Sequence, residues 1–143
     1  MLFRSFNLFD LIKNRIKDGM PTYGSCAGMI MVADEILEPA SGQESFGGIP
    51  MTVRRNAFGS QVESFEETID IEGVGPYLGV FIRAPWVEKV DPAVKVLANV
   101  ERGSSHPVMV AYKNILATSF HPEITSDTRI HSYFLSAIVS NYV

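Results

Sequence analysis

The feature that most constrains this chain is its single cysteine, which lies in the segment Gly24-Ser25-Cys26-Ala27-Gly28. This pattern is typical of a sharp strand-to-helix turn that exposes a central nucleophile. Glycines flank such turns because neighbouring elements crowd them and a Cβ would clash. The N-terminus of the following helix is expected to favour the thiolate. A lone cysteine is otherwise most often an inert core residue, so the pattern indicates a nucleophile only if the chain also supplies a base.

A second segment supplies that base. His121 ends a short apolar stretch, and Glu123 follows two residues later. Residues two apart in an extended segment face the same way, so the carboxylate can bind one imidazole nitrogen and leave the other to accept a proton. Alone, this pair could equally be the solvated end of a strand. Together with Cys26 it predicts a nucleophile, a base and an orienting carboxylate.

Two further segments carry a resemblance to a known family. Residues 55–61 read RNAFGSQ and are followed by ESFE at 63–66, and residues 80–85 read VFIRAP. With the cysteine turn and the segment SFHPE at 119–123, they make the chain similar to class I glutamine amidotransferases. Within that class it resembles the glutaminase subunits of the two-component pyridoxal 5'-phosphate synthases. The resemblance runs from about Gly19 to the end of the chain.

The resemblance implies an α/β fold, namely a three-layer, flavodoxin-like mixed sheet flanked by helices, in a single glutaminase domain over residues 1–143. Members of the family open with a strand, a helix, a second strand and a Gly-Gly-Glu-Ser loop that supplies an oxyanion-hole amide. Nothing in Met1–Lys17 matches that loop, and Met1–Asp18 resembles the helix after it. We therefore expect an opening unit of roughly 45 residues to be missing. Losing one oxyanion donor can lower the rate about a hundredfold.

The resemblance also implies the roles of the site residues. By position, Arg55, Ile82 and Arg83 would contact the substrate L-glutamine, and the backbone N–H of Ala27 would bind the oxyanion. The ammonia released would pass to a partner, the synthase subunit that forms pyridoxal 5'-phosphate. No metal or organic cofactor is implied for the glutaminase subunit.

Composition excludes several other classes. A length of 143 residues suits one domain with a single core. A net charge of −4, with acids and bases interspersed, argues against a nucleic-acid surface. A single cysteine excludes an internal disulfide and suits a reducing cytoplasm. No stretch approaches the length of a membrane span or reads as a signal peptide, so we expect a cytoplasmic protein that binds no membrane.

The spacing of apolar residues predicts the remaining elements. The expected helices are 3–17, 27–37 and a C-terminal helix that is capped by Ser126 or Asp127 and turns Ile130, Phe134, Leu135 and Ile138 to the core. The expected strands are 20–24, 51–53, 68–71, 77–84, 94–100, 108–111 and 115–120. Arg54 is expected to be solvated and His106 to lie in a turn over 101–107.

Two other functions stay open at this stage. The chain could be a catalytically impaired fragment or a scaffold, because the oxyanion loop is not found. It could also be the glutaminase subunit of another amidotransferase or a γ-glutamyl hydrolase. The segments at 55–61 and 82–83 argue against the second alternative, whereas only an activity measurement separates the first from the leading hypothesis.

Overall fold

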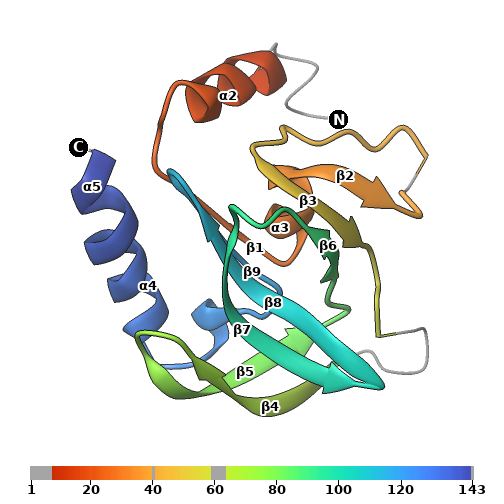
Figure 1. The fold of residues 1–143 in the computed structure, drawn as a ribbon, viewed down its shortest axis with the longest axis vertical. Coiled ribbons are helices and arrows are strands. Elements are labelled where there is room, and N and C mark those ends of the chain that lie inside the picture. Colours follow the sequence, from red (N-terminus) through yellow and green to blue (C-terminus); the bar gives the residue numbers. More distant parts are fainter. Residues whose placement is uncertain (1–7, 40, 59–63, 143) are drawn as a thin grey trace.

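The computed structural model describes residues 8–39, 41–58 and 64–142. Within these ranges the strands form three hydrogen-bonded sheets, and helices flank them (Figure 1). The strands are β1 (Thr22–Ser25), β2 (Ala33–Leu37), β3 (Ile49–Arg54), β4 (Ser64–Ile71), β5 (Gly75–Ile82), β6 (Trp86–Val90), β7 (Lys95–Arg102), β8 (Ser104–Tyr112) and β9 (Ile115–Thr118). The helices are α2 (Leu8–Lys17), α3 (Ala27–Val32), α4 (Arg129–Tyr133) and α5 (Ser140–Tyr142), with a 3-10 turn η1 at Pro122–Ile124 and a π-helical stretch η2 at Phe134–Val139.

The largest sheet determines where the ends of two strands meet. Its order is β1-β9-β8-β7, in which β1 and β9 are parallel and the other pairs are antiparallel hairpins. The parallel register pairs Ser25 with Thr118. The residues that follow β1 and β9 therefore leave the sheet at the same edge. Parallel and antiparallel pairs together confirm the expected mixed α/β fold flanked by helices.

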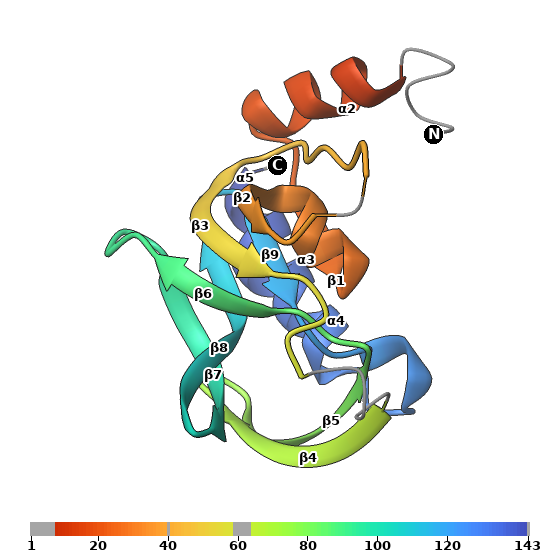
Figure 2. The same cartoon turned by 90° about the vertical axis from the view of Figure 1, so that its right-hand side faces the viewer.

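Strand β9 separates two hydrophobic cores. Ile115 and Ala117 face one core, which also contains residues of α2, α3, β2, β3 and β6. Leu116 faces the other, which contains residues of β4, β5, β7 and α4. All three side chains are fully or almost fully buried. Because side chains alternate along a strand, this short apolar strand places α3 and the C-terminal helices on opposite faces of the sheet (Figure 2).

The two smaller sheets extend these cores. Strands β2, β3 and β6 form one sheet, with β2 parallel and β6 antiparallel to β3. Strands β4 and β5 form a long antiparallel hairpin. The N–H of Glu72, just after β4, donates to the carbonyl of Leu97 in β7 at 2.9 Å. Backbone bonding thus joins the hairpin to the central sheet and brings the end of β5 toward the cysteine turn.

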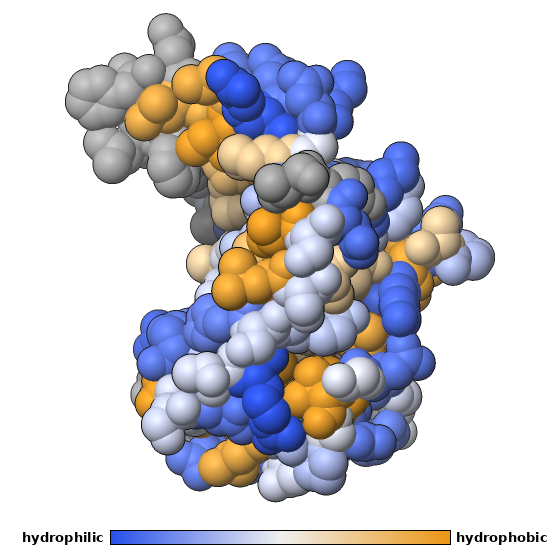
Figure 3. Space-filling view, turned by 90° about the vertical axis from the view of Figure 1, so that its left-hand side faces the viewer, coloured by the Kyte–Doolittle hydropathy of each residue, from blue (hydrophilic) through white to orange (hydrophobic). Residues whose placement is uncertain are grey.

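A buried amide adds hydrogen bonds to the apolar packing that attaches helix α2 to the rest of the molecule. Asn114 Nδ2 donates to the carbonyls of Ile16 at 2.9 Å and Met20 at 2.7 Å. These are carbonyls at and just beyond the end of the helix, where the helical bonding pattern stops, although that of Ile16 also accepts the N–H of Gly19 at 3.1 Å. In the space-filling view the part of the chain that contains α2 stands above a narrower waist (Figure 3). Asn114 therefore supplies much of the polar attachment of α2.

A cleft of about 480 Å³ lies where α2 approaches the body of the molecule. Its lining includes Lys13, Lys17 and Lys113 together with Asp34. It adjoins Asn114 and Ile115 at the beginning of β9, whereas His121 follows the other end of that strand. This cleft is therefore separate from the segments that carry the predicted triad.

Several predicted elements are confirmed within one to four residues at each end, among them the strands at 51–53, 77–84 and 115–120. The first five residues of the expected helix 3–17 lie outside the described residues. The expected helix 27–37 is wrong after Val32, because residues 33–37 form β2 and pair with β3. The apolar spacing of this short segment fits either structure, and pairing with a distant strand decides between them. None of the described helices has the length and apolar character needed to cross a bilayer.

Three further expectations require correction. Strand β6 was not expected at all. His106 lies within β8, and the turn of that hairpin is confined to Gly103. Leu135 is 59% exposed, whereas Ile130 and Ile138 are buried as expected. The π-helical stretch that contains Leu135 winds more widely than an α-helix, so the 3.6-residue spacing used for the prediction does not hold there.

The attachment of α2 leads to a stability prediction. Asn114→Ala removes both donors and leaves the carbonyls of Ile16 and Met20 without this partner. We expect the free energy of unfolding in a urea titration to fall by about 1–3 kcal/mol. The matched control Asn99→Ala changes an exposed asparagine in β7 and should stay within about 0.5 kcal/mol of the parent. Equal values for the two variants would contradict this role for Asn114.

Candidate active site

The cysteine turn has the strained backbone expected of a nucleophile at a strand-helix junction. Cys26 follows β1 directly and precedes α3, with φ 54° and ψ −106°. Positive φ in a residue other than glycine costs of order 1–3 kcal/mol and persists only where the surroundings hold it. Here the N–H of Cys26 donates to the carbonyl of Thr118 in β9 at 2.8 Å. The parallel strand pair thus extends one hydrogen bond into the turn.

The two glycines of the turn have different surroundings. A Cβ on Gly24 would lie 2.4 Å from the carbonyl oxygen of Gly28, a backbone atom, so the first glycine is required sterically. A Cβ on Gly28 would meet no described atom within 4 Å. The expectation of crowding is therefore confirmed for Gly24 and wrong for Gly28 among the described residues.

His121 and Glu123 form the predicted pair. Imidazole Nδ1 lies 2.6 Å from Glu123 Oε2. A carboxylate only accepts hydrogen bonds, so Nδ1 carries the proton and Nε2 is left as an acceptor. The backbone N–H of His121 donates to the carbonyl of Val80 in β5 at 2.9 Å. The imidazole segment is therefore held between the central sheet and the β4–β5 hairpin.

The fold brings Cys26 and His121 to the same edge. Cys26 comes directly after β1, and His121 lies three residues beyond the end of its parallel neighbour β9. The Cys26 thiol itself points at β5, where Sγ donates to the carbonyl of Ile82 at 3.6 Å. Strand β5 thus contacts both the nucleophile and the backbone of the base.

The surroundings of the thiol oppose its ionisation. Burial raises the pKa of Cys26; the hydrogen bond from the Ala27 N–H lowers it, and the negative charge of Glu123 raises it further. The net rise is contrary to the expectation that the following helix favours the thiolate. The reason is that α3 has only six residues, so it offers little dipole against the cost of burying a charge. A raised pKa keeps the resting Cys26 a thiol, so a role as nucleophile would require a base.

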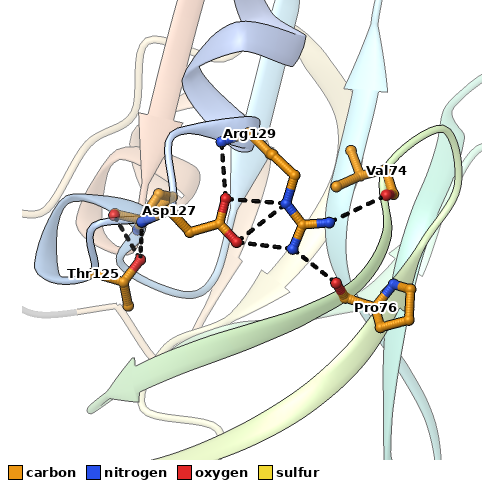
Figure 4. A network of polar contacts seen from close by, with 6 residues as sticks. Val74, Pro76, Thr125, Asp127 and Arg129 are labelled. Carbon is orange, nitrogen blue, oxygen red and sulfur yellow. Dashed lines mark hydrogen bonds and ion pairs between the residues drawn. The ribbon is translucent and has the colours of Figure 1, made fainter.

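Glu123 is held in the ionised form that its role requires. The little burial it has acts to raise its pKa, but hydrogen bonds from His121 and from its own backbone N–H bring the pKa below the ordinary value. The carboxylate lies in η1, and the chain beyond it is anchored by Arg129 (Figure 4). The guanidinium pairs with Asp127 at 2.8 Å and donates to the carbonyls of Val74, in the β4–β5 turn, and Pro76, in β5.

The anchoring residues also test the expected helix cap. The residue before α4 is Thr128, which makes no side-chain cap. Instead Asp127 Oδ1 accepts the N–H of Arg129, the first residue of the helix, at 3.1 Å. Asp127, one of the two residues expected to cap this helix, therefore satisfies one of its free donors.

The three residues expected to contact substrate lie on two neighbouring segments. Ile82 ends β5 beside the thiol, and Arg83 follows it with φ 45°, exposed to solvent. Arg55 follows β3, is exposed, and donates from Nε to the carbonyl of Glu38 at 3.4 Å. The N–H of Ala57 donates to the carbonyl of Ala84 at 3.1 Å and joins the two segments.

The neighbouring arginine has a different environment. Arg54 was expected to be solvated, but its Nε lies 3.2 Å from Glu88 Oε2 and its Nη1 lies 3.5 Å from Glu38 Oε1. It is part of a surface ion-pair group and only 31% of its side chain is exposed. Residues 59–61 and 63 of the family-like segment lie outside the described residues.

Three polar residues near the triad were not singled out from the sequence. Tyr23 and Thr118 are hydrogen-bonded across β1 and β9 at 2.7 Å. Ser119 donates from its hydroxyl to the carbonyl of Pro85, just beyond the Arg83 segment. Thr118 and Ser119 are both fully buried. The adjacent hydroxyl residues Thr118 and Ser119, at the end of an otherwise apolar buried segment, are the sequence signal that could have identified this group.

The comparisons with known proteins agree with this geometry. The SNO glutamine amidotransferase family matches residues 1–140. The chain belongs to that family. It is 56% identical over 138 residues to "Pyridoxal 5'-phosphate synthase subunit PdxT" of Streptomyces coelicolor. The matched region covers 95% of this chain and 67% of that protein. It is 53% identical over 140 residues to the protein of the same name from a Nocardioides species, covering 96% of this chain and 70% of that protein.

A solved structure supports the same assignment. A crystal structure of a glutamine amidotransferase superposes with a TM-score of 0.86 at 43% identity, covering 96% of this chain and 71% of that chain. The class I glutamine amidotransferase-like fold expected from the sequence is therefore confirmed.

The surroundings of the two glycines of the cysteine turn predict opposite outcomes of the same substitution. Gly24→Ala places a methyl group against the backbone of Gly28, so we expect loss of cooperative unfolding or a fall in Tm. Gly28→Ala adds a methyl group in open space and should leave Tm nearly unchanged. Circular dichroism melting curves make the comparison, and a larger fall for Gly28→Ala would show that the turn differs from the structure described.

The raised pKa of Cys26 can be measured directly because it is the only thiol. The rate of alkylation by iodoacetamide should rise with pH through a midpoint above that of a free cysteine, about 8.5. Glu123→Gln removes a negative charge and should move that midpoint down. Glu66→Gln, an exposed site in β4, should not move it. A parent midpoint below 8.5 would mean that the thiolate is favoured after all.

Proposed function

We infer that this chain is a glutaminase that hydrolyses the side-chain amide of L-glutamine and supplies the ammonia for pyridoxal 5'-phosphate synthesis. Membership of the SNO glutamine amidotransferase family and the relatives named as subunits of a pyridoxal 5'-phosphate synthase support this activity. The observation that carries it is the hydrogen-bonded pair of His121 and Glu123 at 2.6 Å, just beyond β9, the strand that pairs with β1 and its strained cysteine turn.

In the proposed reaction Cys26 is the nucleophile. Because its pKa is raised, the thiol needs a base, and Nε2 of His121 takes its proton as the sulfur attacks the amide carbon. The Ala27 N–H, which already donates toward the sulfur, stabilises the oxyanion. The imidazolium, supported by Glu123, then gives its proton to the departing nitrogen. Ammonia leaves and a thioester of glutamate remains on the sulfur.

The second half of the reaction regenerates the cysteine. A water molecule gives a proton to Nε2 of His121 and attacks the thioester carbon, glutamate is released, and the sulfur recovers a proton. The same imidazole therefore serves twice as base and twice as acid. The Glu123 carboxylate, hydrogen-bonded to Nδ1, keeps the imidazole in the tautomer that both half-reactions require.

Arg55, Ile82 and Arg83 are proposed to hold the substrate. Ile82 already contacts the sulfur through its carbonyl, so the side chain of Arg83 extends from the residue next to the reacting atom. An exposed guanidinium suits the α-carboxylate of glutamine, which it can bind with two parallel hydrogen bonds. The bond between Ala57 and Ala84 keeps the Arg55 segment beside this position.

The proposed partner is the synthase subunit that accepts the ammonia. Ammonia released into water at neutral pH is protonated and no longer nucleophilic. Delivery therefore requires that the acceptor bind over the edge where β1 and β9 end, and we propose that this subunit condenses the ammonia with sugar phosphates to form pyridoxal 5'-phosphate.

The assignment of the triad is tested by four substitutions. Ammonia release from glutamine, measured with the synthase subunit present, should be abolished by Cys26→Ala. It should fall by about two to four orders of magnitude in His121→Asn, and by less in Glu123→Gln, which leaves the imidazole in place. His106→Asn is the control, since His106 stacks on Trp86 with ring centroids 3.6 Å apart. If His106→Asn were as damaging as His121→Asn, the base would be wrongly assigned.

A further inference from the structure

A buried hydroxyl links the two strands that carry the proposed nucleophile and base. Thr118 is the last residue of β9, three positions before His121, and none of its surface is exposed. Its Oγ1 lies 2.7 Å from the phenol oxygen of Tyr23, which is in β1 three positions before Cys26. The side-chain bond thus crosses the two parallel strands diagonally, because the ladder pairs Tyr23 with Leu116 and Thr118 with Ser25.

The direction of the bonds follows from the partners. Thr118 Oγ1 donates its single proton to the carbonyl of Phe120 at 3.0 Å, so it accepts from the phenol of Tyr23. Burial raises the pKa of Tyr23 far above its ordinary value, although the bond to Thr118 opposes the rise, and the phenol therefore stays protonated as a donor. The chain of bonds runs from Tyr23 through Thr118 to the peptide carbonyl directly before His121.

The backbone of the same residue holds the nucleophile. The carbonyl of Thr118 accepts the N–H of Cys26 at 2.8 Å. The β-ladder ends at the pair of Ser25 and Thr118, so beyond this point no further strand pairing sets the distance between the two chains. Thr118 is therefore the last residue that contacts both the cysteine turn and the segment that leads to the imidazole.

We propose that Thr118, with Tyr23 as its donor, is a positioning residue that sets the imidazole of His121 relative to the sulfur of Cys26. The inference rests on the proposed glutaminase function. Thr118 does not touch the reacting atoms. It acts by turning the Phe120 carbonyl, and with it the peptide that bears His121, toward the edge where Cys26 emerges.

A role limited to stabilising the core makes a different prediction. Thr118→Val leaves the half-buried Tyr23 phenol without this acceptor, which lowers stability whatever the function of the pair. Removing both hydroxyls, in Tyr23→Phe/Thr118→Val, replaces the pair by apolar groups of similar shape and can be nearly neutral for stability. The double variant still lacks the bond to the Phe120 carbonyl, so positioning and stability are separated.

The experiment compares kcat and KM for glutamine hydrolysis, with the synthase subunit present. The variants are Thr118→Val, Thr118→Ser and Tyr23→Phe/Thr118→Val. The control is Thr68→Val, which changes an exposed threonine in β4. We expect Thr118→Val and the double variant to lose roughly tenfold to a hundredfold in kcat with little change in KM. The double variant should recover most of the lost Tm but not the kcat. Thr118→Ser keeps the hydroxyl, so its kcat should stay within a few-fold of the parent value. The kcat of Thr68→Val should equal that of the parent.

A second measurement keeps this inference independent of the activity. Hydrogen exchange of the backbone amides of Cys26 and His121 should be faster in Thr118→Val and in the double variant than in Thr118→Ser. If the parent chain hydrolysed no glutamine, the proposed function would fail, and the amide exchange alone would decide the positioning role. Parent-like kcat and exchange in the double variant would overturn the proposal, as would a loss of kcat that simply followed Tm.

Discussion

The parallel pairing of β1 with β9 is the interaction on which the rest of the site depends. It joins segments that are 95 residues apart at the bond of Tyr23 to Thr118. Parallel strands end at the same edge, so the residue after one strand and the segment after the other emerge together. The pair is buried between two cores, because Leu116 faces one and Ala117 the other. Apolar packing on both faces therefore stabilises the strand pair, and the hydrogen bond from the Cys26 N–H to the Thr118 carbonyl extends it to the segments of the proposed nucleophile and base.

The electrostatics of the site are a compromise around one carboxylate. Glu123 binds the imidazole of His121 and, from the same position, contributes to the raised pKa of Cys26. A resting thiol is less open to adventitious oxidation or alkylation than a thiolate. In the proposed reaction, attack on the substrate must then be coupled to proton transfer. The placement of the imidazole therefore matters more than it would for a cysteine that is already ionised.

Backbone strain is found at both walls of the site. Cys26 and Arg83 have φ of 54° and 45°, and the carbonyl of Ile82, directly before Arg83, accepts the Cys26 thiol. Such conformations persist where surrounding bonds over-determine them. Here the Cys26 N–H donates to the carbonyl of Thr118, and the Ala57 N–H donates to the carbonyl of Ala84. The strained residues are thus held by the elements that the fold brings to this edge.

By itself the sequence determined the chemistry and the local elements that carry it: the cysteine turn, the pair of His121 and Glu123, and the short strand that precedes them. These are local patterns, in which the spacing of residue types decides which side chains share a face. Tertiary structure alone decided that residues 33–37 form a strand, that residues 86–90 pair with β3, and that Leu135 faces solvent. It also decided that burial raises the pKa of Cys26, and that Thr118 bonds both Cys26 and Tyr23. The exposure of Leu135 follows from the π-helical winding of η2. Each of the others depends on a partner far away in the chain, and the physical reason is that pairing and desolvation are set by neighbours in space.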